Sequence, residues 1–323
     1  MTALLPDSLY VSLQRLLPQH ALSRAAGAIA DCRWPWLRQL LIRAAIRRYG
    51  IDLSEAAETD CRRYSSFNEF FVRPLAPGAR PLSGDEGTLI APADGMLSAA
   101  GALRDGQLLQ AKGHGFPVAA LVGDDGHRVR ALAGGSFATI YLSPRDYHRV
   151  HAPLAGRLVA ADYLPGRLFS VNPRTDRTLP GLYAGNERLV CWFDTAAGGL
   201  ALVLVGALLV AGIETVWQAG YRPGLRHRRW FAGDDPAFRF RRGAELGRFR
   251  FGSTVILLAP PGITWSAVAG RGIQLGEPLG RIEAHQPPAP PASGPAGAAL
   301  SPSGGSAPEA GPAGPPGAPP PPA

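Results

Sequence analysis

Apolar residues in the first 50 positions recur at the spacing of a helix face. Two sets follow this spacing: Leu9, Leu13, Leu16 and Leu17, and then Leu37, Leu40, Leu41, Ala44 and Ala45. Arginines are offset from the second set, and Trp34 and Trp36 lie beside it. Residues 1–62 are therefore expected to form amphipathic helices. A basic amphipathic helix with tryptophan is typical of a helix that lies in a membrane interface, and packing on the protein core is the alternative.

From about Thr88 onward, short apolar runs alternate with glycine-rich turns. The runs at 135–141, 189–193 and 254–258 combine β-branched or aromatic residues with small or polar neighbours. Runs of this length bounded by turns predict strands. We therefore expect an α+β fold, in which amino-terminal amphipathic helices precede a mainly antiparallel, barrel- or sandwich-like β core within residues 63–285.

One uncharged run, 195–213, has nearly the length of a membrane-spanning helix. Four glycines interrupt it, and glycine at this density disfavours a helix more than it disfavours paired strands. The pattern predicts two buried strands, near 201–205 and 208–213, which are broken at Gly206. A transmembrane helix is the alternative.

The end of the chain has a different composition. Its last 38 residues, 286–323, contain 14 of the 32 prolines, with one charged residue, Glu309, and one large aliphatic residue, Leu300. Such a segment cannot bury enough apolar surface to offset the entropy lost on ordering. We predict a disordered tail.

Arginine dominates the positive charge, with 32 arginines against one lysine and a net charge of +8. An excess of arginine suggests anionic partners such as phosphates or membranes, and compositional drift is the plain alternative. The lysine, Lys112, is followed by Gly113 and His114, which excludes a P-loop. A pyridoxal phosphate enzyme would have to form its Schiff base on Lys112.

Cysteine and histidine spacing does not indicate a metal site. Cys32, Cys61 and Cys191 are odd in number and far from any CxxC spacing, which argues against a disulfide scaffold and a structural zinc site. His148 and His151 lie three residues apart in a segment that reads as extended, where such positions point to opposite faces. A histidine here suits proton transfer better than metal binding.

Two further positions could carry chemistry. Asp94 precedes Gly95, as many turn aspartates do. Ser253 follows Gly252 at the start of an apolar strand without a G-x-S-x-G hydrolase motif, so a turn is its plain interpretation. A Gly-Ser pair also meets the minimal needs of self-cleavage, because glycine leaves its carbonyl open and the serine hydroxyl lies within reach of it.

Together, the motifs of this chain resemble those of the bacterial-type phosphatidylserine decarboxylases. The resemblance follows the order of the family through the motifs at 67–74, 91–95, 110–114, 141–153, 164–172, 186–188, 205–207, 213–217 and 247–255. Each short motif is weak by itself, whereas the ordered set is specific. Phe251 replaces the leucine that this family commonly has before Gly-Ser-Thr, and we expect altered packing and intact cleavage there.

The resemblance implies that the chain makes its own cofactor. Asp94, His151 and Ser253 match the self-processing triad of the family, in which Asp94 orients His151 and His151 takes the proton of Ser253. The Ser253 oxygen would attack the Gly252 carbonyl, and the resulting ester would break down to leave a covalent pyruvoyl group. Fragments 1–252 and 253–323 would remain together as a heterodimer, which could itself pair into a dimer.

The resemblance also implies the reaction, which converts phosphatidylserine to phosphatidylethanolamine and carbon dioxide. The pyruvoyl group would form a Schiff base with the substrate amine and act as the electron sink. His148 matches the position of the proton donor, and Tyr141 on the same motif is a substrate-binding candidate. Arg145 and Arg149 either hold the phosphoserine head group or are solvated surface charges. No metal, pyridoxal phosphate or nucleic acid is expected.

Phosphatidylserine is anionic and stays in its bilayer. The amino-terminal helices are therefore expected to hold the enzyme on the inner cell membrane, as a peripheral protein on its cytoplasmic face. The competing hypothesis is a non-catalytic, membrane-binding β module that is never processed.

Overall fold

The computed structural model describes residues 6–110, 114–123, 126–208, 212–221, 224–231, 233, 235–250 and 252–283. The chain divides into two units, Met1–Ala284 and His285–Ala323, and every described residue belongs to the first. The predicted disordered tail, the substitution at Phe251 and the lysine Lys112 lie outside the described residues.

Three helices precede the strands: α1 (Asp7–Leu16), α2 (Gln19–Ala30) and α3 (Pro35–Tyr49). Pro35 suits the first turn of α3 because its fixed φ is helical, and Gly50 ends this helix in the left-handed conformation, with a φ of 66°. The two predicted helices are confirmed as α1 and α3. The pattern did not predict α2, in which small alanines hold many of the positions that large apolar residues mark in the other two helices.

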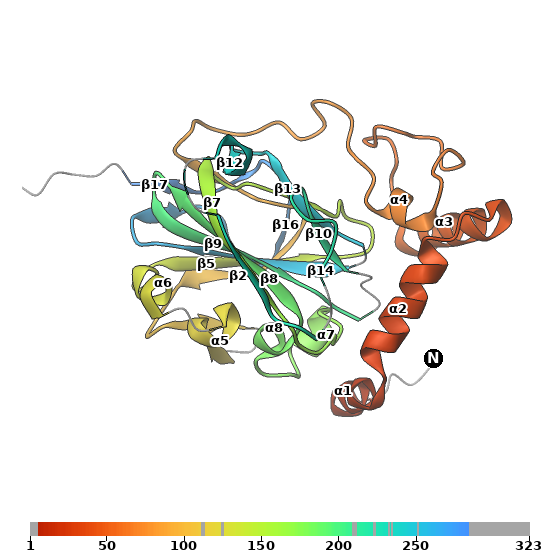
Figure 1. Cartoon of the computed structure of the whole chain (residues 1–323), viewed down its shortest axis with the longest axis horizontal. Helices are drawn as coiled ribbons and strands as arrows, with labels where there is room; N and C mark the ends of the chain where they lie inside the picture. Colours follow the sequence, from red (N-terminus) through yellow and green to blue (C-terminus); the bar gives the residue numbers. More distant parts are fainter. Residues whose placement is uncertain are drawn as a thin grey trace, which may run out of the picture. The chain divides into compact units, whose positions relative to one another are not determined.

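A short helix, α4 (Phe67–Phe71), joins the amino-terminal helices in a core of their own. Ser66 caps α4 by accepting a hydrogen bond from the backbone N–H of Glu69. Phe67, Phe70 and Phe71 pack with Ile42 of α3. Figure 1 shows α1 to α4 gathered on one side of the strands.

An antiparallel sheet of nine strands forms the centre of this unit. Its order is β11-β7-β8-β9-β14-β5-β2-β16, with β12 also paired to β7. The strands are β2 (Gly95–Ala102), β5 (Ser136–Leu142), β7 (Gly156–Leu164), β8 (Arg188–Thr195), β9 (Gly198–Val205), β11 (His227–Trp230), β12 (Arg239–Phe240), β14 (Ser253–Ala259) and β16 (Arg271–Ile273). The described strands run from one edge, β11, to another, β16, so the sheet is open, and of the two expected forms the core is not a closed barrel.

Smaller sheets and short helices surround the large sheet. One small sheet has the order β1-β17-β15, another β10-β13-β6, and β3 pairs with β4. Their bounds are β1 (Thr88–Ile90), β17 (Pro278–Ile282), β15 (Ile263–Trp265), β10 (Ile213–Thr215), β13 (Glu245–Phe249), β6 (Arg149–His151), β3 (Gln107–Leu109) and β4 (Gly115–Pro117). The helices are α5 (Val118–Val122), α6 (Gly126–Ala131), α7 (Pro173–Asp176), α8 (Leu182–Gly185) and the 3₁₀ helix η2 (Pro236–Phe238).

The large sheet is buried on both faces, which confirms a layered, mainly antiparallel core. Val255 and Leu257 of β14 pack in a cluster that includes residues of the small sheets, among them Val150, Leu246 and Leu279. The alternate residues Ile256 and Leu258 pack in a second cluster with Leu121 of α5 and Leu182 of α8. Figure 1 shows α5 to α8 along one face of the sheet. Burial on two faces explains why β14 reads as a continuous apolar run.

The uncharged run 195–213 forms strands in its described part. β8 and β9 are antiparallel neighbours, and β9 ends at Val205, just before Gly206. The first predicted strand of this run is therefore confirmed. Of the second, Leu208 lies in a turn and Ile213 begins β10, while 209–211 lie outside the described residues. None of the helices in the described ranges has the length and apolar character needed to cross a bilayer.

Candidate active site

The strand order brings Ser253 and Asp94 to the same end of the large sheet. β5 lies between β14 and β2, and Ser253 at the start of β14 pairs with Leu142 at the end of β5. Asp94 directly precedes β2, whose Met96 pairs with Tyr141. Adjacent strands lie about 4.8 Å apart, so the starts of β14 and β2 are separated by roughly 10 Å.

The two candidate histidines lie on the segment that leaves this end of β5. Asp146 shapes the connecting loop by accepting hydrogen bonds from the backbone N–H and the hydroxyl of Ser143, each at 2.7 Å. β6 follows, and the backbone N–H of His151 donates to the carbonyl of Pro92 at 2.8 Å. Pro92 precedes Asp94 by two residues. The fold therefore gathers Asp94, His148, His151 and Ser253 from three separate segments.

Ser253 has the most unusual surroundings of the four. Its side chain is fully buried, and its Oγ has no hydrogen-bond partner among the described residues. Gly252 precedes it, so no side chain shields the carbonyl that the hydroxyl would attack. Most buried hydroxyl groups are hydrogen-bonded, because leaving one unpaired costs about 1–3 kcal/mol.

His148 is the second fully buried group with an unpartnered atom. Its Nδ1 lies 2.8 Å from the carbonyl oxygen of Asp146, and a carbonyl only accepts, so Nδ1 carries the proton. Its Nε2 has no partner among the described residues. Burial beside the ring of Phe71, whose centroid lies 4.2 Å away, lowers the pKa of His148 to about 3. His148 is therefore neutral near pH 7, with a free lone pair on Nε2.

His151 is held in the same tautomer by different partners. Its Nδ1 lies 2.8 Å from the carbonyl oxygen of Gly243, and its Nε2 lies 3.1 Å from the hydroxyl of Tyr147. Nδ1 must donate, so Nε2 accepts the hydrogen bond from Tyr147. Burial lowers the pKa of His151 as well. The imidazole is thus neutral and its basic nitrogen is engaged by Tyr147.

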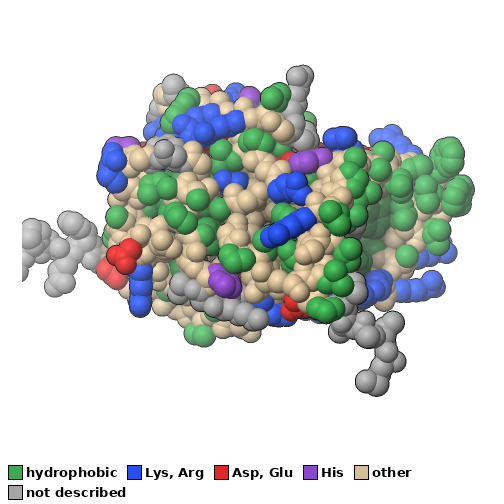
Figure 2. Space-filling model, turned by 90° about the horizontal axis from the view of Figure 1, so that it is seen from below, with side chains coloured by type: hydrophobic (Ala, Val, Ile, Leu, Met, Phe, Trp, Pro, Cys, Tyr) green, Lys and Arg blue, Asp and Glu red, His purple; other side chains and the backbone are tan. Residues whose placement is uncertain are grey.

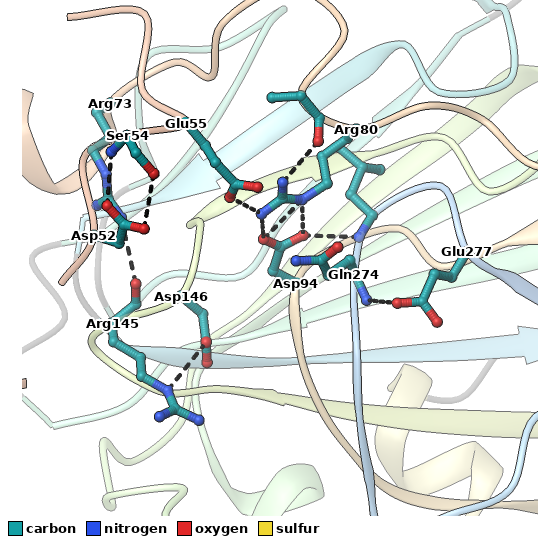
Figure 3. Close-up of polar contacts among 12 residues, drawn as sticks. Asp52, Ser54, Glu55, Arg73, Arg80, Asp94, Arg145, Asp146, Gln274 and Glu277 are labelled. Atoms are coloured by element: carbon teal, nitrogen blue, oxygen red, sulfur yellow. Dashed lines mark hydrogen bonds and ion pairs between the residues drawn. The ribbon is translucent and has the colours of Figure 1, made fainter. Parts of the chain in front are cut away.

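Asp94 is held by an arginine that sequence reasoning missed. Arg80 donates from Nε and Nη2 to the carboxylate of Asp94, the shortest distance being 2.7 Å, and also from Nη2 to Glu55 at 2.8 Å. The backbone N–H of Leu275 donates to the same carboxylate at 2.8 Å. Figure 3 shows Arg80 between Glu55 and Asp94. No local motif indicates this contact, because Arg80 and Asp94 are 14 residues apart.

The predicted triad members are therefore neighbours in the fold without being hydrogen-bonded to one another. Among the described residues, Asp94 bonds to Arg80 and Leu275, His151 bonds to Tyr147 and Gly243, and Ser253 Oγ bonds to nothing. Tyr147 could have been found from the sequence, since it lies four residues before His151 within the 141–153 motif. The catalytic roles of the triad stay predictions.

The other candidates are spread around this end of the sheet. Tyr141 lies on β5 and pairs with Thr254, whereas Ser253 pairs with its neighbour Leu142. Successive residues point to opposite faces, so the side chains of Tyr141 and Ser253 lie on opposite faces of the sheet. The guanidinium of Arg149 donates hydrogen bonds to the carboxylate of Glu245 at 2.7 Å and to the carbonyl oxygen of Val72 at 2.9 Å.

A polar cavity of about 330 Å³ adjoins Asp94. Arginines and carboxylates line it together with Tyr147: Asp52, Glu55, Arg73, Arg80, Asp94, Arg145, Asp146 and Glu277. Figure 3 shows these charged side chains converging from separate segments. The exposed Arg145 lies 3.7 Å from Asp146. Among the described residues, no group of three or more His, Cys, Asp and Glu side chains could hold a metal ion.

A second cavity, of about 400 Å³, has a different character. It lies among α2, α3 and α4 and is lined mainly by apolar side chains, including Ile29, Leu41 and Phe67. Arg48 and Arg250 are its charged lining residues. The amino-terminal helices thus enclose an apolar groove beside the charged end of the sheet.

Comparison with known proteins identifies the family. The sequence model of the family described as phosphatidylserine decarboxylase matches residues 67–281, and a second model, described as PSD, matches residues 9–50. A phosphatidylserine decarboxylase proenzyme of Bordetella pertussis is 50% identical over 279 residues, which cover 84% of this chain and 94% of the relative. The proenzyme of the same name from Pseudomonas aeruginosa is 50% identical over 258 residues, covering 79% and 89%.

A third relative, from Methylococcus capsulatus, carries the same name and is 48% identical over 284 residues, covering 86% of this chain and 98% of its own. The family match spans well over half of the chain and includes all of the candidate residues at the end of the large sheet. The chain therefore belongs to the phosphatidylserine decarboxylase family.

Proposed function

We propose that this chain decarboxylates phosphatidylserine to phosphatidylethanolamine and carbon dioxide after cutting itself between Gly252 and Ser253. Family membership supports the reaction, and the word proenzyme in the names of the relatives supports the cut. The observation that carries the proposal is the buried Ser253 hydroxyl, which directly follows Gly252 and has no partner in the described part of the chain.

Self-cleavage requires a base for the Ser253 proton, and His151 Nε2 is that base. Burial lowers the pKa of His151, and the hydrogen bond to Gly243, then the charge of Glu245 and last that of Asp94 partly offset this. The neutral ring can therefore accept a proton, and the nearby carboxylates stabilise the charged ring. Ser253 must first replace Tyr147 at Nε2. Its Oγ then bonds to the Gly252 carbonyl carbon while the Gly252–Ser253 C–N bond breaks, and the proton moves to the released nitrogen.

The surroundings of Ser253 suit the pyruvoyl group that would form once the ester eliminates the Gly252 carboxylate and water hydrolyses the resulting dehydroalanine, with release of ammonia. In a pyruvoyl group the ketone oxygen takes the place of the Ser253 nitrogen and Cβ becomes a methyl group, so Oγ is lost from this fragment. Because Oγ has no hydrogen-bond partner among the described residues, its loss breaks no hydrogen bond. β14 holds this position through its main chain, between β5 and β9. The pyruvoyl carbonyl supplies an electron sink for the electron pair left behind when carbon dioxide departs.

His148 moves the proton in the second reaction. Its Nδ1–H is committed to the carbonyl of Asp146, and its Nε2 lone pair is free. Nε2 can therefore accept a proton from the substrate ammonium before carbon dioxide leaves. The same nitrogen returns that proton to the α-carbon afterwards, which completes the amine product.

The amino-terminal helices bring the site to the bilayer. Large apolar side chains stay exposed on them: Leu13, Leu16, Trp34, Trp36 and Leu40. Figure 2 shows hydrophobic side chains gathered at the right-hand end, over these helices, with cationic side chains among them. Exposed apolar and basic groups on one surface favour binding to an anionic membrane. We place the enzyme on the cytoplasmic face of the cell membrane as a peripheral protein.

The test is the mass of the purified full-length protein under denaturing conditions. We expect fragments 1–252 and 253–323, the smaller with a blocked amino end, and release of carbon dioxide from phosphatidylserine. Ser253→Ala should remain one inactive chain. Ser136→Ala is the matched control, because Gly135 and Ser136 are also a Gly-Ser pair at the start of a strand, and it should be cut normally.

Two outcomes would contradict the proposal. The first is a wild-type chain that stays whole and still releases carbon dioxide, and the second is a Ser253→Ala chain that is still cut. A chain that binds phosphatidylserine vesicles without being cut or releasing carbon dioxide would instead support the non-catalytic membrane module.

A further inference from the structure

Among the described residues, Arg73 is a buried cation with no anionic partner within hydrogen-bond distance. Arg73 follows α4 in the chain and is only 4% exposed. Its Nε and Nη1 have no hydrogen-bond partner among the described residues, and its Nη2 reaches only the carbonyl of Arg145, at 3.4 Å. A buried charge that lacks a partner is expensive, because it has lost its water without compensation.

The neighbours of Arg73 fix its position, and the carboxylates of Asp94, Asp146 and Asp52 act on its charge only from beyond hydrogen-bond distance. The guanidinium carbon lies 5.5 Å from the centre of the Phe70 ring, which supports one face of the guanidinium. Arg149 holds the preceding carbonyl, that of Val72, at 2.9 Å. Burial lowers the pKa of Arg73, yet a guanidinium keeps its proton in proteins. Arg73 is thus a preorganised and permanent positive charge.

The carboxylates that share the cavity with Arg73 have other partners. Asp52 accepts from the N–H and hydroxyl of Ser54, and Asp146 accepts from Ser143 in the same way. The remaining three are also occupied: Glu55 and Asp94 by Arg80, and Glu277 by Arg271 and the N–H of Gln274. Figure 3 shows Arg73 at the edge of this group, beside Asp52 and Arg145.

The position of Arg73 connects the cavity with the proposed chemistry. Arg73 and Asp94 line the same space of about 330 Å³, a size within the range of small-molecule sites. After burial and the hydrogen bond to Asp146, the charge of Arg73 is a further influence on the pKa of His148. Arg73 therefore lies near the histidine to which the proposed reaction assigns the proton.

We infer that Arg73 receives an anionic group of the substrate head group, either its carboxylate or its phosphate. This inference rests on the proposed function and adds a binding residue to it. A guanidinium presents two parallel N–H donors that match a carboxylate or phosphate. Nε and Nη1 are unpartnered among the described residues, and either forms such a pair with Nη2, whose contact with the Arg145 carbonyl is long, at 3.4 Å.

The experiment measures binding instead of turnover. It uses the full-length Ser253→Ala chain, which is expected to stay whole and therefore cannot consume the probe. Glycerophosphoserine, glycerophosphoethanolamine and inorganic phosphate are titrated calorimetrically into this chain and into versions that also carry Arg73→Gln, Arg73→Lys or Arg281→Gln. Arg281 is the matched control, because it is an arginine outside the lining of this cavity, with a side chain that is 64% exposed.

Arg73→Gln should weaken glycerophosphoserine binding about ten- to a hundredfold, as expected for the loss of a charged hydrogen bond. Arg281→Gln should change it less than about threefold. Equal weakening for glycerophosphoethanolamine assigns the phosphate to Arg73, and unchanged binding of that probe assigns the carboxylate.

Unchanged glycerophosphoserine binding in Arg73→Gln would overturn the inference. So would inorganic phosphate that binds as tightly as glycerophosphoserine and depends equally on Arg73, because the site would then hold free phosphate. If Arg73→Gln loses its cooperative thermal transition, Arg73→Lys decides: a weakening of about fivefold or more supports the inference and wild-type affinity rejects it. Failure of the wild-type chain to cut itself would show separately, in its mass.

Discussion

At the scale of single residues, the two histidines of the candidate site differ in their hydrogen-bond partners. His148 and His151 are both neutral because burial lowers their pKa values, and both donate from Nδ1 to a carbonyl. They differ at Nε2, which is free in His148 and accepts from Tyr147 in His151. The Nε2 of His148 can therefore accept a proton directly, whereas the Nε2 of His151 must first lose its hydrogen bond to Tyr147.

Removing the Tyr147 hydroxyl should release the base of His151. Tyr147→Phe takes away the hydrogen bond at Nε2, so Ser253 no longer competes for this nitrogen. We expect self-cleavage to speed up by roughly two- to tenfold, the value of one ordinary hydrogen bond. The rate is followed as disappearance of the uncut chain after synthesis in a cell-free system.

Tyr141→Phe serves as the control, because the Tyr141 side chain lies on the opposite face of the sheet from Ser253. It should be cut at the wild-type rate. Slower cleavage in Tyr147→Phe would mean that the hydroxyl relays the proton instead of competing for the base.

At the scale of elements, the sequence predicted what local patterns encode. The strand predicted at 254–258 is β14, and the run at 135–141 is β5, because short apolar runs between turns are sufficient to indicate strands. The register that sets Ser253 against Leu142 was not predictable. Pairing of distant strands depends on the whole fold, as does the contact of Arg80 with Asp94. The residues of the site could be named, but their hydrogen bonds could not.

The amino-terminal helices carry a prediction about membrane binding. Trp34 and Trp36 are each 64% exposed, with ring centroids 6.4 Å apart, so both rings are available to an interface. Changing both to Gln should weaken binding to vesicles of phosphatidylserine and phosphatidylcholine by roughly tenfold or more, measured by co-sedimentation.

Trp230→Gln is the matched control for this measurement. Trp230 lies on β11 and is 55% exposed, so it is also a surface tryptophan but belongs to a different element. It should leave vesicle binding unchanged. An equal loss in this variant, or no loss in the double variant, would refute the role of the helices.

At the scale of the whole molecule, the proposed cut falls beside the middle of the large sheet. β14 begins at Ser253, pairs with β5 on one side and β9 on the other, and is buried along its whole length. β16 and β17 also belong to the smaller fragment, and they pair with β2 and β1 of the larger one. The two fragments share one core, so neither contains the complete sheet.

We therefore expect the two fragments to stay together after cleavage. In native size-exclusion chromatography they should elute as one species, and they should separate only at denaturant concentrations that unfold the sheet. Far-ultraviolet circular dichroism on the same samples reports the unfolding. Separation of the fragments while the dichroism remains native would contradict the shared core.

The central position of β14 also determines whether folding or cleavage comes first. If the fragment that begins at Ser253 were a separate chain, β14 would have to insert between β5 and β9 after both had folded. Until then, the unpaired edges of β5 and β9 would be prone to aggregation. A continuous chain avoids this, because β14 is still covalently joined to the preceding chain while the sheet forms. Assembly must therefore come before cutting, and the mature enzyme retains an arrangement that its separated pieces would not readily rebuild. Unfolding of the cleaved enzyme is therefore expected to be irreversible.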